Sequence, residues 1–500
     1  MKKVMKRIGA LMVSAVIALS SSIVAAAEEG YTYNYDYWRD VQYGPDAYNV
    51  IGVYTSVELG LDTKLSLAES LYVNGNMLYI CDTGNNRIIE LERTSHDKFE
   101  LKRYITEFKG GKGVKTLSAP SDISVTEDGY MFICDRNNNR VLKLDMDLNF
   151  VMEFTKPTDP NFDQSLSFLP NKLITDKAGR VYCIATNINK GLIKFEPDGE
   201  FSGFVGATPV SYNMADYLKK KFATAAQRAK MESFVPTEYT NLYVDEDGFI
   251  YAVTNNLSAA DITNGKVHPV RRLNLLGNDI LVRNGEWPII GDLYTDKGGG
   301  FEGPSRMMDI TSFENGVYTC LDKTRGRLFT YDDQGRLLWA FGGGGGNADG
   351  YFKLPVSLEH MGYDLIVLDQ QDASITLFTP TEFGNKVYQA LDQFANGEYE
   401  AAGETWQSVI DLNGNYDLAY IGIGRTLLRQ ERYKEAMDYF ELKYDLDNYS
   451  RAFKQYRQQW VEDHILLIIV GVLLILCVPL MIGRIRKIKW QIDTADIFRI

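Results

Sequence analysis

Short runs of alternating apolar and polar residues, each closed by a glycine turn, recur along most of this chain. In the clearest copy, Ser121–Thr126 alternates, a turn at Gly129 follows, and the apolar run Tyr130–Cys134 comes next. The runs Arg140–Leu144 and Phe150–Phe154 complete the unit. Alternation with a period of two, interrupted by short turns, predicts antiparallel strands joined by hairpins. This unit is therefore predicted to be a four-stranded sheet.

The same turn occurs six times, and an aspartate or a replacement follows the glycine after six or seven residues. The glycines are Gly75, Gly129, Gly179, Gly248, Gly316 and Gly362, and the partner positions are Asp82, Asp135, Ala185, Thr254, Asp322 and Asp369. Self-similarity at a period of roughly 40–50 residues is typical of propellers and solenoids. We therefore predict an all-β six-bladed propeller over residues 48–380. A seventh, degenerate blade over Arg271–Ile290 is the alternative.

The last unit lacks an outer strand, because helical sequence starts soon after Phe378. An alternating run, Tyr48–Thr55, precedes the first unit without a partner. Pairing the two would close the ring and leave no free sheet edge. Two insertions, Asp216–Ser233 with helical composition and Leu257–His268 in a loop, interrupt the repeat.

After Phe383 the periodicity becomes helical. Three pairs of positions lie 34 residues apart: Tyr399 and Tyr433, Ala402 and Ala436, and Trp406 and Phe440. Small residues at a fixed place let paired helices approach, and the aromatic residues fill the space between them. The pattern predicts a small all-α helical-repeat region over residues 384–447 and a juxtamembrane helix over residues 449–463.

Both ends of the chain carry membrane-targeting patterns. Residues 1–27 have a basic start, an apolar stretch and Ala25-Ala26-Ala27, which is typical of a cleaved signal peptide; an uncleaved anchor is the alternative. Residues 465–483 are apolar without a charge and would span about 28 Å as a helix. The basic tail over residues 484–500 follows, and positive charge stays cytoplasmic. We therefore expect a single-pass type I protein of a bacterial plasma membrane, with residues 28–463 extracellular.

Charge and cysteine content narrow the choice of partners. The net charge is −13, so the protein repels phosphate backbones and a nucleic-acid partner is not expected. The five cysteines form no disulfide framework, and Cys81 and Cys134 occupy equivalent repeat positions that are expected to hold buried thiols.

An aspartate and an arginine five residues apart recur in three of the units. The pairs are Asp82 and Arg87, Asp135 and Arg140, and Asp322 and Arg327. The strings from Cys81 to Arg87 and from Cys134 to Arg140 resemble the NHL repeat, and the resemblance covers about residues 48–378. It implies a six-bladed propeller. Because an active site is normally unique, three copies of one constellation indicate a structural role, in which the carboxylate binds turn N–H groups and the arginine pairs with it.

Residues 384–447 resemble two tetratricopeptide repeats, on the tyrosine, alanine and aromatic positions given above and on Gly424 in the second copy. Ala390 replaces that glycine in the first copy, and no proline ends either repeat. The resemblance implies a recognition scaffold that is too short to be stable alone.

The segment preceding the propeller, residues 28–47, is rich in tyrosine. Its aromatic side chains are candidates for stacking on a sugar or gripping a peptide, and the alternative is that they pack this arm onto the propeller. The candidates are Tyr33, Tyr35, Tyr37 and Trp38.

Catalytic and metal-binding patterns find little support. The histidines His96, His268, His360 and His464 form no ligand spacing and occupy unmatched repeat positions, so no catalytic residue, cofactor or metal is assigned. We expect a non-catalytic binding, scaffold or accessory subunit of a membrane complex that recognises a protein, a peptide or a carbohydrate. The alternatives are an extracellular lyase or lactonase, which some NHL-like propellers are, and an assembly factor for a membrane or exported protein.

Overall fold

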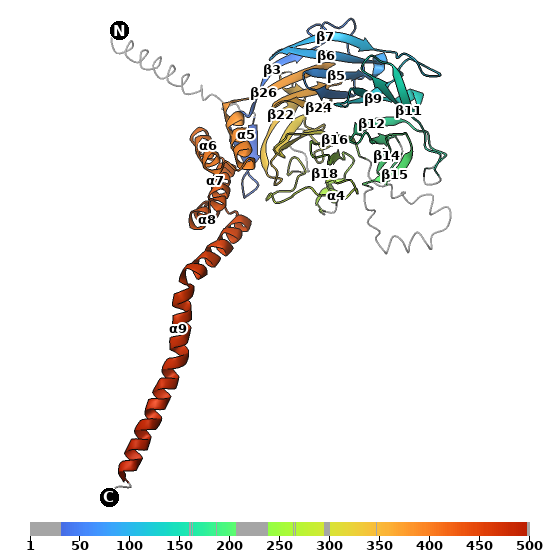
Figure 1. Cartoon of the computed structure of the whole chain (residues 1–500). Coiled ribbons are helices and arrows are strands. Elements are labelled where there is room, and N and C mark those ends of the chain that lie inside the picture. The colour runs from blue at the N-terminus through green and yellow to red at the C-terminus, as the bar shows by residue number, and fades with distance from the viewer. Residues whose placement is uncertain are drawn as a thin grey trace, which may run out of the picture. The chain divides into compact units, whose positions relative to one another are not determined.

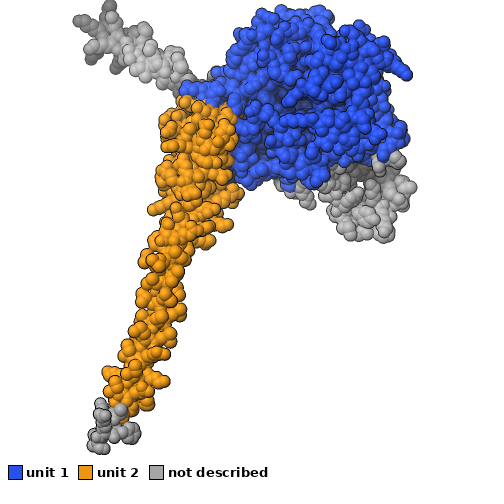
Figure 2. Space-filling view, in the orientation of Figure 1, with its two compact units in different colours: residues 1–385 blue, residues 386–500 orange. Residues whose placement is uncertain are grey.

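The computed structural model describes residues 32–497 except 160, 161, 163, 187, 207–238, 264, 266, 295–300 and 347. The predicted signal peptide and the insertion over residues 216–233 lie outside the described residues. The chain divides into two compact units, residues 1–385 and 386–500 (Figure 2). The first is a β-propeller and the second is helical (Figure 1).

The described strands of the first unit form six sheets, five with four or more strands and one with three. Three sheets come first: β4 (Ser70–Asn74), β5 (Met77–Asp82), β6 (Arg87–Ser95) and β7 (Lys98–Ile105); β8 (Pro120–Val125), β9 (Tyr130–Asp135), β10 (Arg140–Asp145) and β11 (Phe150–Phe154); β12 (Pro170–Thr175), β13 (Val181–Ala185), β14 (Leu192–Phe195) and β15 (Phe201–Val205). Three follow: β16 (Asn241–Val244), β17 (Ile250–Val253) and β18 (Val270–Leu273); β19 (Met307–Ser312), β20 (Tyr318–Asp322), β21 (Arg327–Tyr331) and β22 (Leu337–Gly344) with β23 (Tyr351–Phe352); β24 (Pro355–Met361), β25 (Asp364–Asp369) and β26 (Ser374–Pro380).

The predicted hairpins are formed at the glycine turns. Gly129 adopts a φ of 84° between β8 and β9, a conformation that residues with a side chain rarely take. Side chains on alternate positions pack between neighbouring sheets. One cluster, for example, joins Leu71 and Ile80 of the β4–β7 sheet with Ile366 and Leu377 of the last sheet. The core is therefore a set of apolar layers between sheets.

The innermost strands surround a central channel. They contact one another in the order β4, β8, β12, β16, β19 and β24, and β24 contacts β4 again. Strand β3 (Tyr48–Tyr54) pairs with β26, with Tyr54 opposite Ile375 and Tyr48 opposite Pro380. This confirms the predicted closure of the ring by an N-terminal strand. Residues 274–290 form no separate sheet in the described part of the chain, so nothing there supports a seventh blade.

The tyrosine-rich arm also joins the propeller as strands, which the sequence pattern did not predict. Strands β1 (Thr32–Tyr35) and β2 (Val41–Gly44) form a hairpin, and Tyr33 of β1 lies opposite Ala340 of β22. The arm thus extends the β19–β22 sheet before β3 completes the next one. The loop insertion at residues 257–268 contains a short helix, α4 (Ala259–Thr263).

Helices α5 (Glu382–Ala395), α6 (Tyr399–Leu412), α7 (Asp417–Arg429) and α8 (Tyr433–Leu442) follow the propeller. The 34-residue repeat places Ala402 and Ala436 at fully buried positions. A Cβ atom on Gly424 would lie 2.6 Å from the ring of Phe440, so this glycine is needed where α7 and α8 touch. The repeat pattern therefore identifies the contacts that hold this unit together.

The last helix, α9 (Leu446–Ile497), is continuous through the predicted juxtamembrane segment, apolar span and start of the tail. Its backbone shows no break at these predicted boundaries. It is the one helix in the described part of the chain that is long and apolar enough to cross a membrane.

Candidate functional site

Two of the three predicted aspartate–arginine pairs form inside the sheets. Asp82 accepts a hydrogen bond from Arg87 Nε at 2.7 Å and another from the Ser66 backbone N–H at 2.7 Å. Asp135 repeats the arrangement with Arg140 Nε at 2.9 Å and the Ser118 N–H at 2.7 Å. Both carboxylates have no exposed surface. Each pair therefore ties a hairpin to the segment that enters its own sheet, out of reach of a ligand.

The third pair differs from the prediction. Arg327 Nη1 contacts Asp292 at 2.7 Å, and Asp322 instead accepts backbone N–H groups of Arg306 and Thr324, each at 2.8 Å. The cation nearest to Asp322 is Arg325, 3.8 Å away. The reason is that Asp292, from the long connection between β18 and β19, offers a buried carboxylate that competes for the arginine.

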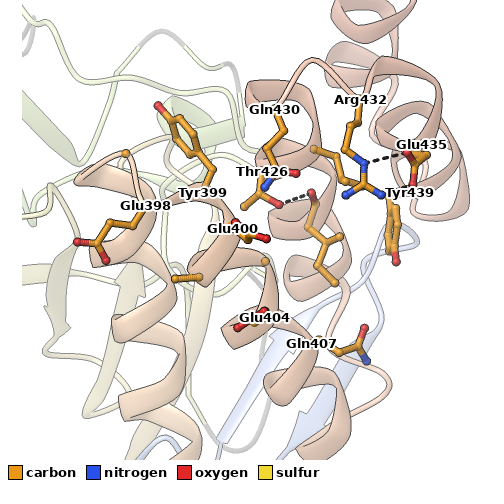
Figure 3. A pocket seen from close by; sticks show the side chains of 15 residues that line it. Glu398, Tyr399, Glu400, Glu404, Gln407, Thr426, Gln430, Arg432, Glu435 and Tyr439 are labelled. Atoms are coloured by element: carbon orange, nitrogen blue, oxygen red, sulfur yellow. Dashed lines mark hydrogen bonds and ion pairs between the residues drawn. The ribbon is translucent and has the colours of Figure 1, made fainter.

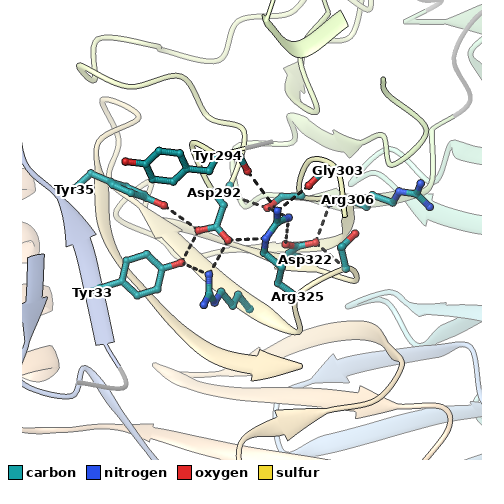
Figure 4. Close-up of polar contacts among 12 residues, drawn as sticks. Tyr33, Tyr35, Asp292, Tyr294, Gly303, Arg306, Asp322 and Arg325 are labelled. Carbon is teal, nitrogen blue, oxygen red and sulfur yellow. Dashed lines mark hydrogen bonds and ion pairs between the residues drawn. The ribbon is translucent and has the colours of Figure 1, made fainter. Parts of the chain in front are cut away.

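Asp292 organises a buried polar cluster at the N-terminal arm (Figure 4). Its Oδ1 accepts hydrogen bonds from the hydroxyl groups of Tyr33 at 2.6 Å and Tyr35 at 2.9 Å. Its Oδ2 contacts Arg325 Nε at 2.9 Å as well as Arg327. Burial and the charge of Asp292 raise the pKa of both tyrosines, so they stay protonated donors. The two are therefore used in docking the arm.

The other two aromatic candidates have a different setting. Trp38 is 65% exposed, and its ring meets the ring of Tyr37 edge-on at 4.9 Å. The structure does not bring this pair into the Asp292 cluster. Ligand contact by Tyr37 and Trp38 stays a prediction.

A ring of six polar side chains lines the channel, one from each innermost strand. In every sheet, the ring residue pairs with the second strand, opposite the residue that precedes the repeated aspartate or its replacement. The six ring residues are Ser70, Asp122, Lys172, Asn241, Asp309 and Ser357. All six are buried. The sequence analysis did not predict this ring, because its members differ in chemistry. Their constant spacing was the available signal, since each lies 12 or 13 residues before the repeated aspartate or its replacement.

Hydrogen bonds made by the ring residues connect the innermost strands to one another. Ser70 Oγ donates to Asp122 at 2.6 Å, and Lys172 Nζ donates to Ser70 Oγ at 3.0 Å. On the other side, Ser357 Oγ donates to Asp309 at 2.8 Å and accepts the Leu71 N–H at 3.0 Å. The channel wall is therefore preorganised by its own polar groups.

The ring holds one cation between two acids. Burial lowers the pKa of Lys172, but Asp122 and Asp309 outweigh burial and raise it. Burial raises the pKa of Asp122, and it raises that of Asp309 to about 6, against the opposing effect of Lys172. At neutral pH this part of the channel therefore keeps a charged lysine and ionised Asp309.

Four members of the ring, Ser70, Asp122, Asn241 and Asp309, also line a cavity of about 350 Å³. The other walls of this cavity include Tyr72, Tyr243, Glu359 and His360. Burial lowers the pKa of His360 to about 4, and its Nδ1 lies 2.6 Å from Thr311 Oγ1, so the ring is neutral at pH 7. Among the described residues, no three histidine, cysteine or acidic side chains are grouped to hold a metal ion. The cavity offers hydroxyl, carboxyl and aromatic groups for binding.

The helical unit has a separate groove of about 1090 Å³ between α6, α7 and α8 (Figure 3). Its acidic side chains are Glu398, Glu400, Glu404 and Glu435. Its one cation, Arg432, donates to Glu435 at 2.8 Å. Tyr399, Tyr439 and Leu427 add apolar surface. The groove is therefore acidic with aromatic patches, which complements a basic segment that carries apolar side chains.

Comparisons with known proteins find distant structural likenesses only. No protein-family model and no curated protein matches the chain. Among solved structures, a catalytically inactive virginiamycin B lyase from Staphylococcus aureus aligns at 10% identity and a TM-score of 0.37, over 66% of this chain and 99% of the lyase. BamB from Moraxella catarrhalis aligns at 10% identity and 0.31, over 62% of this chain and 71% of that one.

A protein of unknown function from Bacteroides caccae aligns at 10% identity and a TM-score of 0.34, over 55% of this chain and 81% of that one. These similarities are too low to carry an argument about function. The NHL-like and tetratricopeptide-like motifs stay resemblances.

Proposed function

We propose that this chain is a membrane-anchored, non-catalytic binding protein of a bacterial plasma membrane that acts as an accessory or scaffold subunit of a membrane complex. In this proposal, six sheets form six blades of an NHL-like propeller outside the cell, and α9 crosses the membrane. The helices α5 to α8 act as a tetratricopeptide-like region that recognises a segment of a protein partner.

The observation that carries the proposal is the acidic, aromatic groove of the helical unit. Glu400 and Glu404 are exposed in it (Figure 3), and neither forms an ion pair with an arginine or lysine in the described part of the chain. Exposed acids at a concave surface attract a basic segment, and tyrosines are common anchors at protein interfaces. A groove that buries apolar side chains between paired helices suits a protein segment better than a sugar.

Membrane anchorage limits where a partner protein can be located. A helix such as α9, apolar and exposed along its span, is stable in a bilayer and would aggregate in water. Binding a partner that lies in or at the same membrane then benefits from a high effective concentration. The partner is therefore expected to be a membrane or exported protein with a basic segment.

Site-specific crosslinking in cells tests this function. A photo-reactive amino acid at Gln407, which lines the groove, should capture a discrete partner, and the added substitution Glu404→Lys should abolish the adduct by charge repulsion. Lys434→Glu serves as the control, because Lys434 is exposed on α8 and does not line the groove. An adduct that survives Glu404→Lys, or that is lost equally with Lys434→Glu, would contradict recognition through the groove.

A further inference from the structure

The cavity inside the propeller channel has an unbalanced set of charged groups. Its described lining contains the carboxyl groups of Asp122, Glu246, Asp309 and Glu359 and contains no lysine or arginine. Lys172 is not among the lining residues, and its Nζ donates hydrogen bonds to Ser70 Oγ at 3.0 Å and to the backbone carbonyl of Glu69 at 3.1 Å. The ammonium group of Lys172 is therefore already hydrogen-bonded to neighbouring groups of the channel wall.

Glu359 is the acid of this lining that is buried without a hydrogen bond from a side chain. It is 9% exposed, lines the cavity, and accepts no hydrogen bond from any side chain in the described part of the chain. Burial raises its pKa well above the usual value, and the charges of Asp309 and Asp122 add to this, whereas its neighbour's backbone N–H and Lys172 oppose it. A buried carboxyl that has a backbone N–H but no side-chain partner is costly to ionise unless a ligand adds a counter-charge.

The groups that face Glu359 from the other strands donate no hydrogen bond to its carboxyl group. Tyr72 on β4 donates its hydroxyl to the Val125 carbonyl at 2.9 Å, and Tyr243 on β16 donates to the Ser312 carbonyl at 3.2 Å. On β24 itself, the neighbouring His360 is neutral and bonded to Thr311 of β19. The two tyrosine rings are thereby held in place, on strands that stand opposite each other in the ring order.

We propose that the channel cavity binds a small organic ammonium ligand, whose cationic nitrogen contacts the carboxylate of Glu359 and lies against the rings of Tyr72 and Tyr243. Aromatic faces attract ammonium groups, and a carboxylate supplies the charge-assisted hydrogen bond. The cavity volume of about 350 Å³ suits a small molecule. This site is independent of partner binding by the helical unit.

Binding should be coupled to a proton. In the empty channel burial and the neighbouring acids favour the neutral form of Glu359, and a cation beside it favours the carboxylate, so ligand binding is expected to release a proton to solvent. Affinity should therefore rise with pH as Asp309, with its pKa of about 6, and Glu359, whose pKa burial raises, lose their protons. For a protonated amine such as putrescine, the rise ends where the ammonium groups of the ligand themselves deprotonate.

Calorimetry on the purified full chain in detergent tests the site, with putrescine and choline as probes and butanediol as the uncharged control. Titrations in two buffers with different ionisation heats measure the proton released. Glu359→Gln should weaken binding of both ammonium probes by at least about tenfold, because both lose the attraction of the carboxylate charge and putrescine also loses a charge-assisted hydrogen bond. Glu246→Gln, at another carboxyl of the lining, should weaken it only about twofold through long-range attraction.

Thermal unfolding of each variant verifies folding, and Glu359→Asp, which keeps the charge, should retain part of the affinity. The proposal is overturned if neither ammonium probe gives saturable heat at millimolar concentration, if butanediol binds as well, or if Glu359→Gln binds like the wild type. Proton uptake on binding, in place of release, would also overturn it.

Discussion

At the scale of residues, the buried aspartates of the propeller hold several groups of their own sheet together by hydrogen bonds. Asp135 has no exposed surface, and it holds Arg140, Asn138 and the Ser118 backbone N–H with three of its acceptor positions. Removing one partner of such a set leaves the others buried without compensation, which costs more than the hydrogen bonds themselves contribute. The stability of the sheet is therefore expected to depend on this carboxylate.

We expect Asp135→Ala to lower the free energy of unfolding by about 1–3 kcal/mol. Urea denaturation of the full chain, followed by tryptophan fluorescence, measures the change. Asp147→Ala is the matched control, because Asp147 is exposed in the next turn of the same sheet. If partner crosslinking is lost while stability is unchanged, Asp135 has a functional role and the structural interpretation is wrong.

At the scale of elements, the N-terminal segment joins two neighbouring sheets. The hairpin β1–β2 extends the β19–β22 sheet, and β3 completes the β24–β26 sheet a few residues later. A strand from the N-terminal side of the propeller that pairs with a strand from its C-terminal side closes the ring without a covalent bond. Its register, with Val53 opposite Thr376, offers a direct test of this closure.

Directly opposed residues on antiparallel strands have a Cα separation that a disulfide can bridge. Val53→Cys combined with Thr376→Cys should therefore crosslink on mild oxidation and raise the free energy of unfolding by about 2 kcal/mol. Thr55→Cys combined with Thr376→Cys, two residues out of register, should crosslink poorly. Equal crosslinking of both pairs would show that the register is different, and crosslinking without added stability would show that unfolding does not start at this closure.

At the scale of the whole molecule, the predicted topology places the propeller and the helical repeat on one side of a membrane and the basic tail on the other. The apolar stretch of α9 and the positive charges that follow it favour this orientation. The native cysteines make labelling practical, since Cys81, Cys134, Cys183 and Cys320 are buried and Cys477 lies within the apolar stretch.

A membrane-impermeant maleimide should label Lys434→Cys in intact, wall-stripped cells and should label Lys489→Cys only after the membrane is permeabilised. The chain without an added cysteine sets the background. Labelling of the Lys489→Cys variant in intact cells, or protection of the Lys434→Cys variant, would reverse the topology and with it the extracellular placement of the groove.

The sequence by itself determined the features that depend on local chemistry. Period-two runs and glycine turns located the strands, because a hairpin needs a residue with positive φ at the turn, as at Gly129. The 34-residue spacing located the helix pairs, because a close helix contact needs a glycine or an alanine, as at Gly424 and Ala436. The unpaired run before the first unit also predicted the closing strand.

Only the tertiary structure decided which distant groups meet. Arg327 pairs with Asp292 and not with Asp322, because a connection of irregular sequence brings a second carboxylate to it. Tyr33 reaches the same carboxylate from 259 residues away. The channel ring and the uncompensated Glu359 arise because the sheets close on themselves and set one residue of each beside its neighbours. No local sequence pattern encodes such contacts. Their energies depend on burial and on nearby charges, and both are set only when distant segments meet in the folded ring.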